Sequence, residues 1–281
     1  MLFGIFLEGQ VKPNIYFLMC PESKKPLIVD WENSILVSED GKSTFPIVNG
    51  IFEMIDSTRN SVAKAYDDVS DVYDSLLTSS GFLLSAYNKA VWGLHDEEYV
   101  SQVLSFIPDV DNQIILDIPV GTGVFTADLY RRLEKTSRVV VADYSAGMLV
   151  KAKKRYQARD LENIVYMHTD VGRLPIQDAS TDVLLTMNGL HAFPDKKSAL
   201  LEMARVLKPG GRLAGCGYIK GKRRFTDMFI NAIYKRLGAF TPPFYELEAF
   251  GEEWGRYFSF DVLENVKSIL MFSGMRNETR L

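Results

Sequence analysis

The stretch from Ile115 to Leu129, ILDIPVGTGVFTADL, holds the residues whose types and spacing best suit ligand binding. Asp117 closes an apolar, β-prone run, and Gly121 and Gly123 follow at the spacing of a tight turn. Apolar residues then recur at helical spacing. In doubly wound α/β sheets, ligands bind at the carboxyl ends of the strands. We therefore predict a nucleotide-like cofactor at this turn.

The residues around the turn separate two cofactor classes. A dinucleotide-binding fingerprint reads G-x-G-x-x-G, and the third glycine position here is Thr126. In such a fingerprint an apolar strand residue would stand where this chain has Asp117. The pattern therefore disfavours a nicotinamide-dependent enzyme, which stays open as one alternative.

With Asp117, Gly121 and Gly123, the turn resembles the first motif of the class I S-adenosylmethionine-dependent methyltransferases, in particular the UbiE-like (type 11) branch. Pro119 replaces the first glycine of that acid-x-Gly-x-Gly-x-Gly motif. The resemblance implies S-adenosylmethionine as cofactor and S-adenosylhomocysteine as product. Pro119 lacks an N–H and fixes φ near −65°. We therefore expect it to reshape the pocket beside the methionine part of the cofactor.

A second motif follows in RVVVADYSAGMLVKAKKR. The apolar run Val139–Ala142 ends at Asp143, and Ser145 is suited to cap the next helix. The resemblance makes Asp143 the acceptor of the ribose hydroxyls, with Tyr144 beside it in the cofactor site. A carboxylate suits this role because it can accept from both vicinal hydroxyls.

Further landmarks come in the order that the family requires. Asp170 and Val171 follow a third strand, and the resemblance implies that the acid meets the adenine amino group while the next residue packs on the ring. A fourth strand, Thr181–Met187, leads to Asn188, which we also assign to the cofactor site. A helix capped by Asp195 and a Lys-Pro-Gly-Gly turn precede the fifth strand.

The order of these landmarks predicts a Rossmann-like, doubly wound α/β fold with a seven-stranded methyltransferase sheet, a small N-terminal β module and a helical cover. Residues 1–57 form the module and residues 58–281 the methyltransferase domain, in which residues 220–260 are an insertion that covers the substrate. A chain of 281 residues is long enough for both parts.

The N-terminal module resembles the zinc-ribbon-like module that precedes some methyltransferases and also occurs as a free-standing tRNA-methyltransferase activator. Its set of cysteine ligands for zinc is incomplete. Serine replaces cysteine at Ser23, which follows Cys20 and Pro21, and at Ser38, a later cysteine position of the module. We expect Cys20 to be a small buried hydrophobe and the module to bind no metal.

Two segments are candidates to cover the site. Tyr66 lies in AYDDVSDVYD, which is similar to the N-terminal cover of small-molecule methyltransferases, although its spacing equally fits core packing. The insertion is rich in aromatic residues, including Trp254, which indicates an apolar or aromatic small substrate. A packed amphipathic helix, Thr226–Leu237, is the other interpretation of this segment.

The implied reaction is direct displacement of a methyl group from a sulfonium by an oxygen, nitrogen or carbon nucleophile. Positioning and water exclusion supply much of such catalysis, and a histidine can assist as a base. Of His95, His168 and His191, only His191 follows the fourth strand at the carboxyl edge of the sheet, so it is the candidate base. His168 is expected to pack inside the third strand.

Composition limits the possible partners. Acidic residues number 36 against 32 basic ones, so no global electrostatic footprint for nucleic acid exists. No apolar run is long enough to span a membrane and no signal sequence is evident, which predicts a cytoplasmic protein. Two alternatives to small-molecule methylation stay open. One is an RNA or protein methyltransferase, favoured by the basic cluster at residues 220–224, and the other is a non-methylating S-adenosylmethionine binder, favoured by Pro119.

Overall fold

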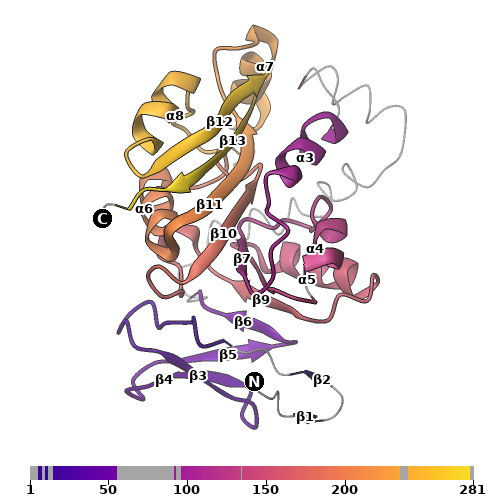
Figure 1. The fold of residues 1–281 in the computed structure, drawn as a ribbon, viewed down its shortest axis with the longest axis vertical. Helices are drawn as coiled ribbons and strands as arrows, with labels where there is room; N and C mark the ends of the chain where they lie inside the picture. Colours follow the sequence, from indigo (N-terminus) through magenta and orange to yellow (C-terminus); the bar gives the residue numbers. More distant parts are fainter. Residues whose placement is uncertain are drawn as a thin grey trace.

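A continuous mixed β-sheet runs through the part of the chain that the computed structural model describes (Figure 1). That part comprises residues 6–7, 10–11, 15–55, 92, 96–133, 135–234 and 240–278. Its eleven strands follow the order β12-β13-β11-β10-β7-β8-β9-β6-β5-β4-β3, and a separate short hairpin pairs β1 with β2.

The elements have the following bounds. The N-terminal strands are β1 Phe6–Leu7, β2 Gln10–Val11, β3 Leu27–Asp30, β4 Ile35–Ser38, β5 Thr44–Val48 and β6 Ile51–Glu53. The later strands are β7 Ile114–Asp117, β8 Arg138–Asp143, β9 Ile164–His168, β10 Thr181–Met187, β11 Leu207–Tyr218, β12 Phe258–Val266 and β13 Ile269–Arg276. The helices are α3 Asp96–Ser105, α4 Ala127–Leu133, α5 Ala146–Gln157, the 3-10 turn η2 Val171–Arg173, α6 Lys196–Val206, α7 Arg224–Phe229, the π-helix η3 Ile230–Tyr234 and α8 Leu247–Trp254.

Seven of the strands, β7 to β13, form the sheet that the sequence predicts. β7 to β11 are parallel to one another, and β13 runs antiparallel to β11. The predicted strand ends at Asp117, Asp143 and Met187 are confirmed. The predicted helix caps are confirmed as well, because Ser145 accepts from the N–H of Met148 at 3.1 Å and Asp195 caps α6.

The expected count of seven strands is wrong for the sheet as a whole. Strands β6, β5, β4 and β3 extend it beyond β9, and β6 pairs with β9 in parallel. An edge strand presents unpaired N–H and C=O groups, and β6 satisfies those of β9. The N-terminal segment also joins the loop after β9, where Leu18 bridges to Ile176 and the N–H of Met19 donates to the carbonyl of Pro175 at 3.0 Å.

Both faces of the parallel strands are buried. Along β8, Val139 and Val141 pack with α3, α4 and α5, whereas Val140 and Ala142 face the layer that contains α6 and α8 (Figure 1). Burial on both faces explains why the strands read as unbroken apolar runs in the sequence. It leaves the strand ends as the places for polar side chains.

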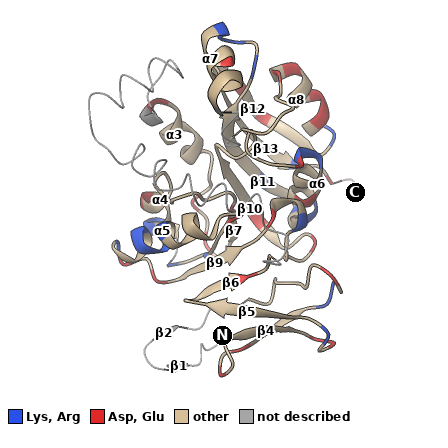
Figure 2. Ribbon diagram, turned by 180° about the vertical axis from the view of Figure 1, so that it is seen from behind, with Lys and Arg blue, Asp and Glu red and all other residues tan. Residues whose placement is uncertain are grey.

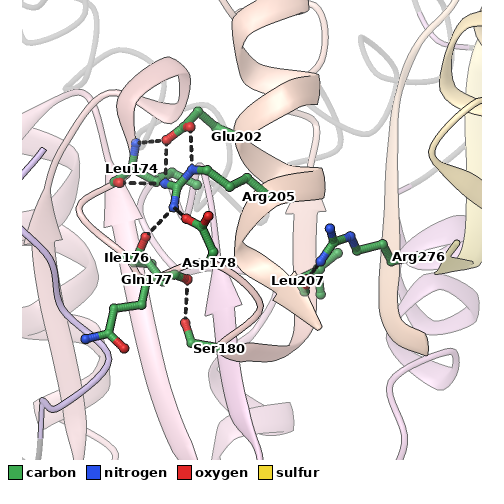
Figure 3. A network of polar contacts seen from close by, with 9 residues as sticks. All are labelled: Leu174, Ile176, Gln177, Asp178, Ser180, Glu202, Arg205, Leu207 and Arg276. Carbon is green, nitrogen blue, oxygen red and sulfur yellow. Dashed lines mark hydrogen bonds and ion pairs between the residues drawn. The ribbon is translucent and has the colours of Figure 1, made fainter. Parts of the chain in front are cut away.

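Arg205 on α6 fixes the loop between β9 and β10 (Figure 3). Its Nε and one terminal nitrogen donate to the carboxylate of Glu202 at 2.6 and 2.7 Å. Its other hydrogens go to Asp178 at 2.6 Å and to the carbonyls of Ile176 and Leu174 at 2.7 and 3.0 Å. A guanidinium has five N–H donors, and all are used here. The loop that carries Asp170 is therefore held firmly against α6.

The C-terminal segment differs from its predicted form. The helix expected over Thr226–Leu237 is α7 followed directly by the π-helix η3. The C-terminal apolar residues form a hairpin of β12 and β13, and Lys267 takes a φ of +54° in the turn between the two strands. Such a left-handed residue reverses the chain where the apolar run continues.

Trp254 belongs to the core rather than to a substrate cover, which corrects the expectation for this residue. Its side chain is fully buried at the end of α8. The indole stacks on Phe250 with 4.8 Å between ring centroids, and the rings of Phe258 and Phe272 lie at 6.0 and 6.1 Å. The aromatic residues of this helix thus hold it against the sheet.

We expect Trp254→Ala to lower the free energy of unfolding by about 3–5 kcal/mol, the usual cost of emptying a large aromatic site. Met228→Ala is the matched control, because Met228 is 62% exposed and its loss should cost little. Chemical denaturation measures both. Equal stability of the two variants would contradict the assignment of Trp254 to the core.

Candidate functional site

The glycine turn lies between the end of β7 and the start of α4. Gly121 and Gly123 adopt φ of +57° and +69°, which side chains other than glycine rarely adopt. A Cβ atom at Gly123 would lie 2.6 Å from ring atoms of Tyr156, so the backbone packs directly on that ring. A Cβ atom at Gly121 would meet no described atom within 4 Å. The turn is therefore packed on one side and open on the other.

Asp117 is buried at the base of this turn, with only 1% of its surface exposed. Its Oδ2 accepts the hydroxyl of Tyr130 at 2.6 Å, while Oδ1 has no partner among the described residues. Burial, together with the nearby charge of Asp143, raises the pKa of Asp117 to about 7. A buried carboxylate with one unsatisfied oxygen favours a cationic or hydrogen-bonding ligand.

Sequence analysis missed two tyrosines under the turn. Tyr130 bonds Asp117, and the hydroxyl of Tyr156 lies 2.8 Å from Oγ1 of Thr126. The two rings meet edge to face at 5.8 Å. The sequence does contain a signal for these tyrosines, because a tyrosine on the buried face of a helix needs a polar partner for its hydroxyl. Thr126, which stands at the third glycine position of the dinucleotide fingerprint, is that partner for Tyr156.

Asp143 lies at the end of β8, beside the glycine turn. Its Oδ2 accepts the N–H of Gly121 at 2.8 Å and its Oδ1 the N–H of Ser145 at 2.9 Å. Burial raises the pKa of Asp143 to about 6, although these bonds and the charge of His168 act in the opposite direction. The structure thus places the two acids predicted for the site at the ends of the adjacent strands β7 and β8, and Asp143 contacts the glycine turn at Gly121.

The other predicted cofactor residues also lie at this edge of the sheet. Asp170 caps η2, with its Oδ1 accepting the N–H of Gly172 at 2.8 Å, and Val171 is buried. Tyr144 is partly buried, and burial and the charge of Asp170 raise its pKa. Asn188 has a φ of +56° after β10 and donates from Nδ2 to the hydroxyl of Tyr99 at 3.1 Å. The roles of these residues toward a ligand stay predictions.

Pro119 connects the cofactor side of the edge with the segment after β10. A Cβ atom at Gly189 would lie 2.3 Å from Cδ of Pro119, so only glycine fits there. The proline ring therefore packs on the backbone that leads to His191. Pro119 links two parts of the site, in addition to any effect that it has on the pocket.

His191 is placed after β10 as predicted, but its surroundings argue against a role as general base. The ring stacks on Phe240 with 3.9 Å between centroids, and its Nδ1 accepts the N–H of Tyr218 at 3.3 Å. Burial, together with the charge of Lys196, lowers the pKa of His191 to about 3. The neutral ring carries its hydrogen on Nε2. It is suited to donate a hydrogen bond rather than to take a proton.

An aromatic cluster surrounds His191. The rings of Phe240 and Trp92 stack at 6.1 Å, and Tyr218 approaches Phe240, Phe244 and Trp92 at 5.9, 5.5 and 6.2 Å. The hydroxyl of Tyr218 donates to Asp227 at 2.6 Å. Residues of β11 and of the segment before α8 thus contact His191, and Asp227 on α7 holds the hydroxyl of Tyr218.

Comparison with known proteins agrees with this geometry. Residues 54–230 match the model of the ubiE/COQ5 methyltransferase family, which is more than half of the chain. The chain belongs to the ubiE/COQ5 methyltransferase family. It is 32% identical to a demethylmenaquinone methyltransferase of Clavibacter sepedonicus, over 61% of this chain and 65% of that protein. It is 40% identical to the ubiquinone/menaquinone biosynthesis C-methyltransferase UbiE of Idiomarina loihiensis, over 35% of this chain and 40% of that protein.

The chain spans less than two thirds of the length of these ubiE/COQ5 relatives. A solved chain from the Haloferax volcanii complex that contains the Trm112 methyltransferase activator aligns with a TM-score of 0.60, at 14% identity. The alignment covers 79% of this chain and all of that one. At this identity the likeness shows the fold alone.

Some predicted features lie outside the described residues. They are Tyr66 with the helical stripe around it, and His95. Within the described residues, Cys20 is fully buried and no group of three His, Cys, Asp or Glu side chains is placed to hold a metal ion. No helix in this part of the chain is long and apolar enough to cross a bilayer.

Basic residues are seen in Figure 2 on α5, beside α7 and on α6. Three of them are engaged within the fold. Arg155 on α5 donates to the carbonyl of Thr122 in the glycine turn, Lys220 pairs with Glu246 at 3.3 Å, and Arg205 on α6 bonds Glu202 and Asp178.

Substitution of the glycines by alanine separates backbone strain from packing at the turn. Gly121→Ala and Gly210→Ala should each cost about 1–2 kcal/mol, because both sites have positive φ and open space. Gly123→Ala should cost clearly more, because its Cβ would overlap the Tyr156 ring. Thermal unfolding of the three variants measures this order. Equal costs at all three positions would contradict the packing described for Gly123.

Proposed function

We propose that the protein transfers the methyl group of S-adenosylmethionine to a ring carbon of an aromatic small molecule. Membership in the ubiE/COQ5 family supports the cofactor and the reaction. The single observation that carries the proposal is the pair of buried carboxylates, Asp117 and Asp143, at the ends of adjacent strands beside a glycine turn that is open at Gly121.

The residues present fit this cofactor. The open space beside Gly121 allows a ligand to contact the backbone of the turn. The Oδ1 atom of Asp117, which has no hydrogen-bond partner among the described residues, favours a positively charged ligand. Each oxygen of Asp143 already accepts one N–H, and each keeps a second lone pair for a ribose hydroxyl. Asp170 and Val171 would hold the adenine. When bound, S-adenosylmethionine supplies a methyl group on a sulfonium.

The aromatic cluster supports an aromatic acceptor. Phe240, Tyr218 and Trp92 offer ring faces and edges, and the neutral His191 offers an Nε2 hydrogen. The relatives are named for ubiquinone and menaquinone biosynthesis. We therefore propose an acceptor from the quinone-precursor class, in its reduced form, whose ring oxygen takes the hydrogen bond from His191.

The chain's own residues act mainly by alignment. Holding two reactants in attack geometry is worth roughly 7–11 kcal/mol at best. The contact of Pro119 with Gly189 fixes the distance between the cofactor turn and the segment that carries His191. If the acceptor reacts as the phenolate of the reduced ring, the new C–C bond would form as the S–CH3 bond breaks, which gives a neutral dienone. The ring C–H proton would then pass to water as the ring becomes aromatic again, and this step needs no strong base on the enzyme.

Asp143→Ala should weaken binding of S-adenosylmethionine and S-adenosylhomocysteine at least tenfold, because the ribose loses its acceptor. Isothermal titration with both ligands and with NAD measures this, and the exposed acid variant Asp128→Asn is the control. Wild-type affinity should fall as the pH drops below about 6, where the carboxylate of Asp143 is protonated. Binding of NAD alone would contradict the proposal, and binding without turnover would favour a non-methylating binder.

Phe240→Ala should raise the KM for a reduced naphthoquinone acceptor about two- to tenfold, since an aromatic pair is worth about 0.5–1.5 kcal/mol. The cofactor affinity should stay unchanged. Phe225→Ala is the matched control, because that ring is 49% exposed on α7. Initial-rate kinetics with varied acceptor make the comparison. An unchanged KM in Phe240→Ala would place the acceptor elsewhere.

A further inference from the structure

Three polar side chains from three neighbouring strands lie in one row across the sheet. Glu53 on β6 is the register partner of His168 on β9, and His168 is the partner of Asp143 on β8. Register partners in parallel strands face the same side of the sheet. His168 and Asp143 are buried, and the side chain of Glu53 is 22% exposed. The row therefore connects Glu53 of the N-terminal module with Asp143, the acid proposed to bind the ribose.

Both ring nitrogens of His168 face hydrogen-bond acceptors. Nδ1 contacts Oε2 of Glu53, and Nε2 lies 3.0 Å from the carbonyl oxygen of Tyr144. A carboxylate and a carbonyl can only accept. With Glu53 as a carboxylate, both contacts are hydrogen bonds when both ring nitrogens carry hydrogen, so the geometry fits the imidazolium form of His168.

Two acidic side chains from neighbouring strands act on the ring of His168. Glu53 on β6 and Asp143 on β8 both favour the imidazolium. Burial by itself lowers the pKa of His168, but the hydrogen bond and charge of Glu53 outweigh it, so the net pKa is raised. In return, the charge of His168 favours the ionised form of Asp143.

We propose that Glu53 is a positioning residue for the cofactor site: it holds His168 as an imidazolium, which fixes the carbonyl of Tyr144 and keeps Asp143 ionised for the ribose hydroxyls. The proposal rests on the function proposed above, and it gives the N-terminal module a part in cofactor binding. The match to the family model begins at residue 54, one residue after Glu53.

The sign of the pH dependence follows from the raised pKa of His168. The stability that the charged ring of His168 contributes to the folded protein is complete below the ordinary histidine pKa of about 6.5. It is lost as the pH rises through the raised pKa of His168 in the folded protein. Asp143 is already ionised at those alkaline pH values, so the effect on cofactor binding appears at the acid limb that Asp143 sets. Without the charge of Glu53, His168 loses its proton at a lower pH, the pKa of Asp143 rises, and the acid limb should move toward neutral pH.

The test uses the full chain and the variants Glu53→Gln and Glu53→Asp, with Glu39→Gln as control because Glu39 is an exposed acid of the same module. NMR titration follows the ring of His168 and the carboxyl carbon of Asp143 without any ligand. In Glu53→Gln we expect the midpoint of His168 to fall by at least one pH unit and that of Asp143 to rise. Glu53→Asp should retain part of the wild-type behaviour, and Glu39→Gln all of it.

Calorimetry with S-adenosylhomocysteine between pH 5.5 and 9 then links these midpoints to binding. The acid limb should move with the Asp143 midpoint, and Kd at pH 6 should rise about two- to fivefold in Glu53→Gln, the change in the ionised fraction for a rise of up to one pKa unit. A purely structural module would lower the melting temperature and leave both midpoints and the limb in place, which would overturn the proposal. A wild-type protein that binds no adenosyl ligand would overturn the proposed function instead, while the NMR midpoints would still decide whether Glu53 sets the charges of His168 and Asp143.

Discussion

The burial of two carboxylates at the ends of adjacent strands is the constraint on which the site depends. Asp117 and Asp143 are almost inaccessible to solvent, and an unpaired buried charge is costly. Their surroundings are arranged to meet that cost. The hydroxyl of Tyr130 serves Asp117, and the backbone N–H groups of Gly121 and Ser145 serve Asp143. The glycine turn thus does two things at once: it supplies a donor and it leaves space for a ligand.

The same constraint explains why the N-terminal module is joined to the sheet. Asp143 needs positive charge nearby, and the chain provides it with a histidine that is itself kept charged by an acid from β6. The module also reaches the loop after β9 through Leu18 and Met19, and Arg205 fixes that loop from α6. Cofactor residues from three strands are therefore held by contacts that extend well beyond the glycine motif.

The acceptor side of the site is built on different principles. Aromatic rings take the place of charged groups there, and burial, together with the charge of Lys196, lowers the pKa of His191 so that its imidazole is neutral. The packing of Pro119 on Gly189 joins this apolar half to the cofactor half. A departure from the family motif at Pro119 thus has a structural partner in a glycine seventy residues later in the chain.

The sequence by itself determined the local elements: the strands that end at Asp117, Asp143 and Met187, and the helix caps at Ser145 and Asp195. These follow from apolar runs and capping residues, which act over a few positions. Tertiary structure alone decided which groups meet. The pairing of β6 with β9, the charge of His168 and the weak basicity of His191 depend on burial and on partners from distant strands. No local pattern encodes such contacts, because a side chain's protonation state is set by its neighbours in space.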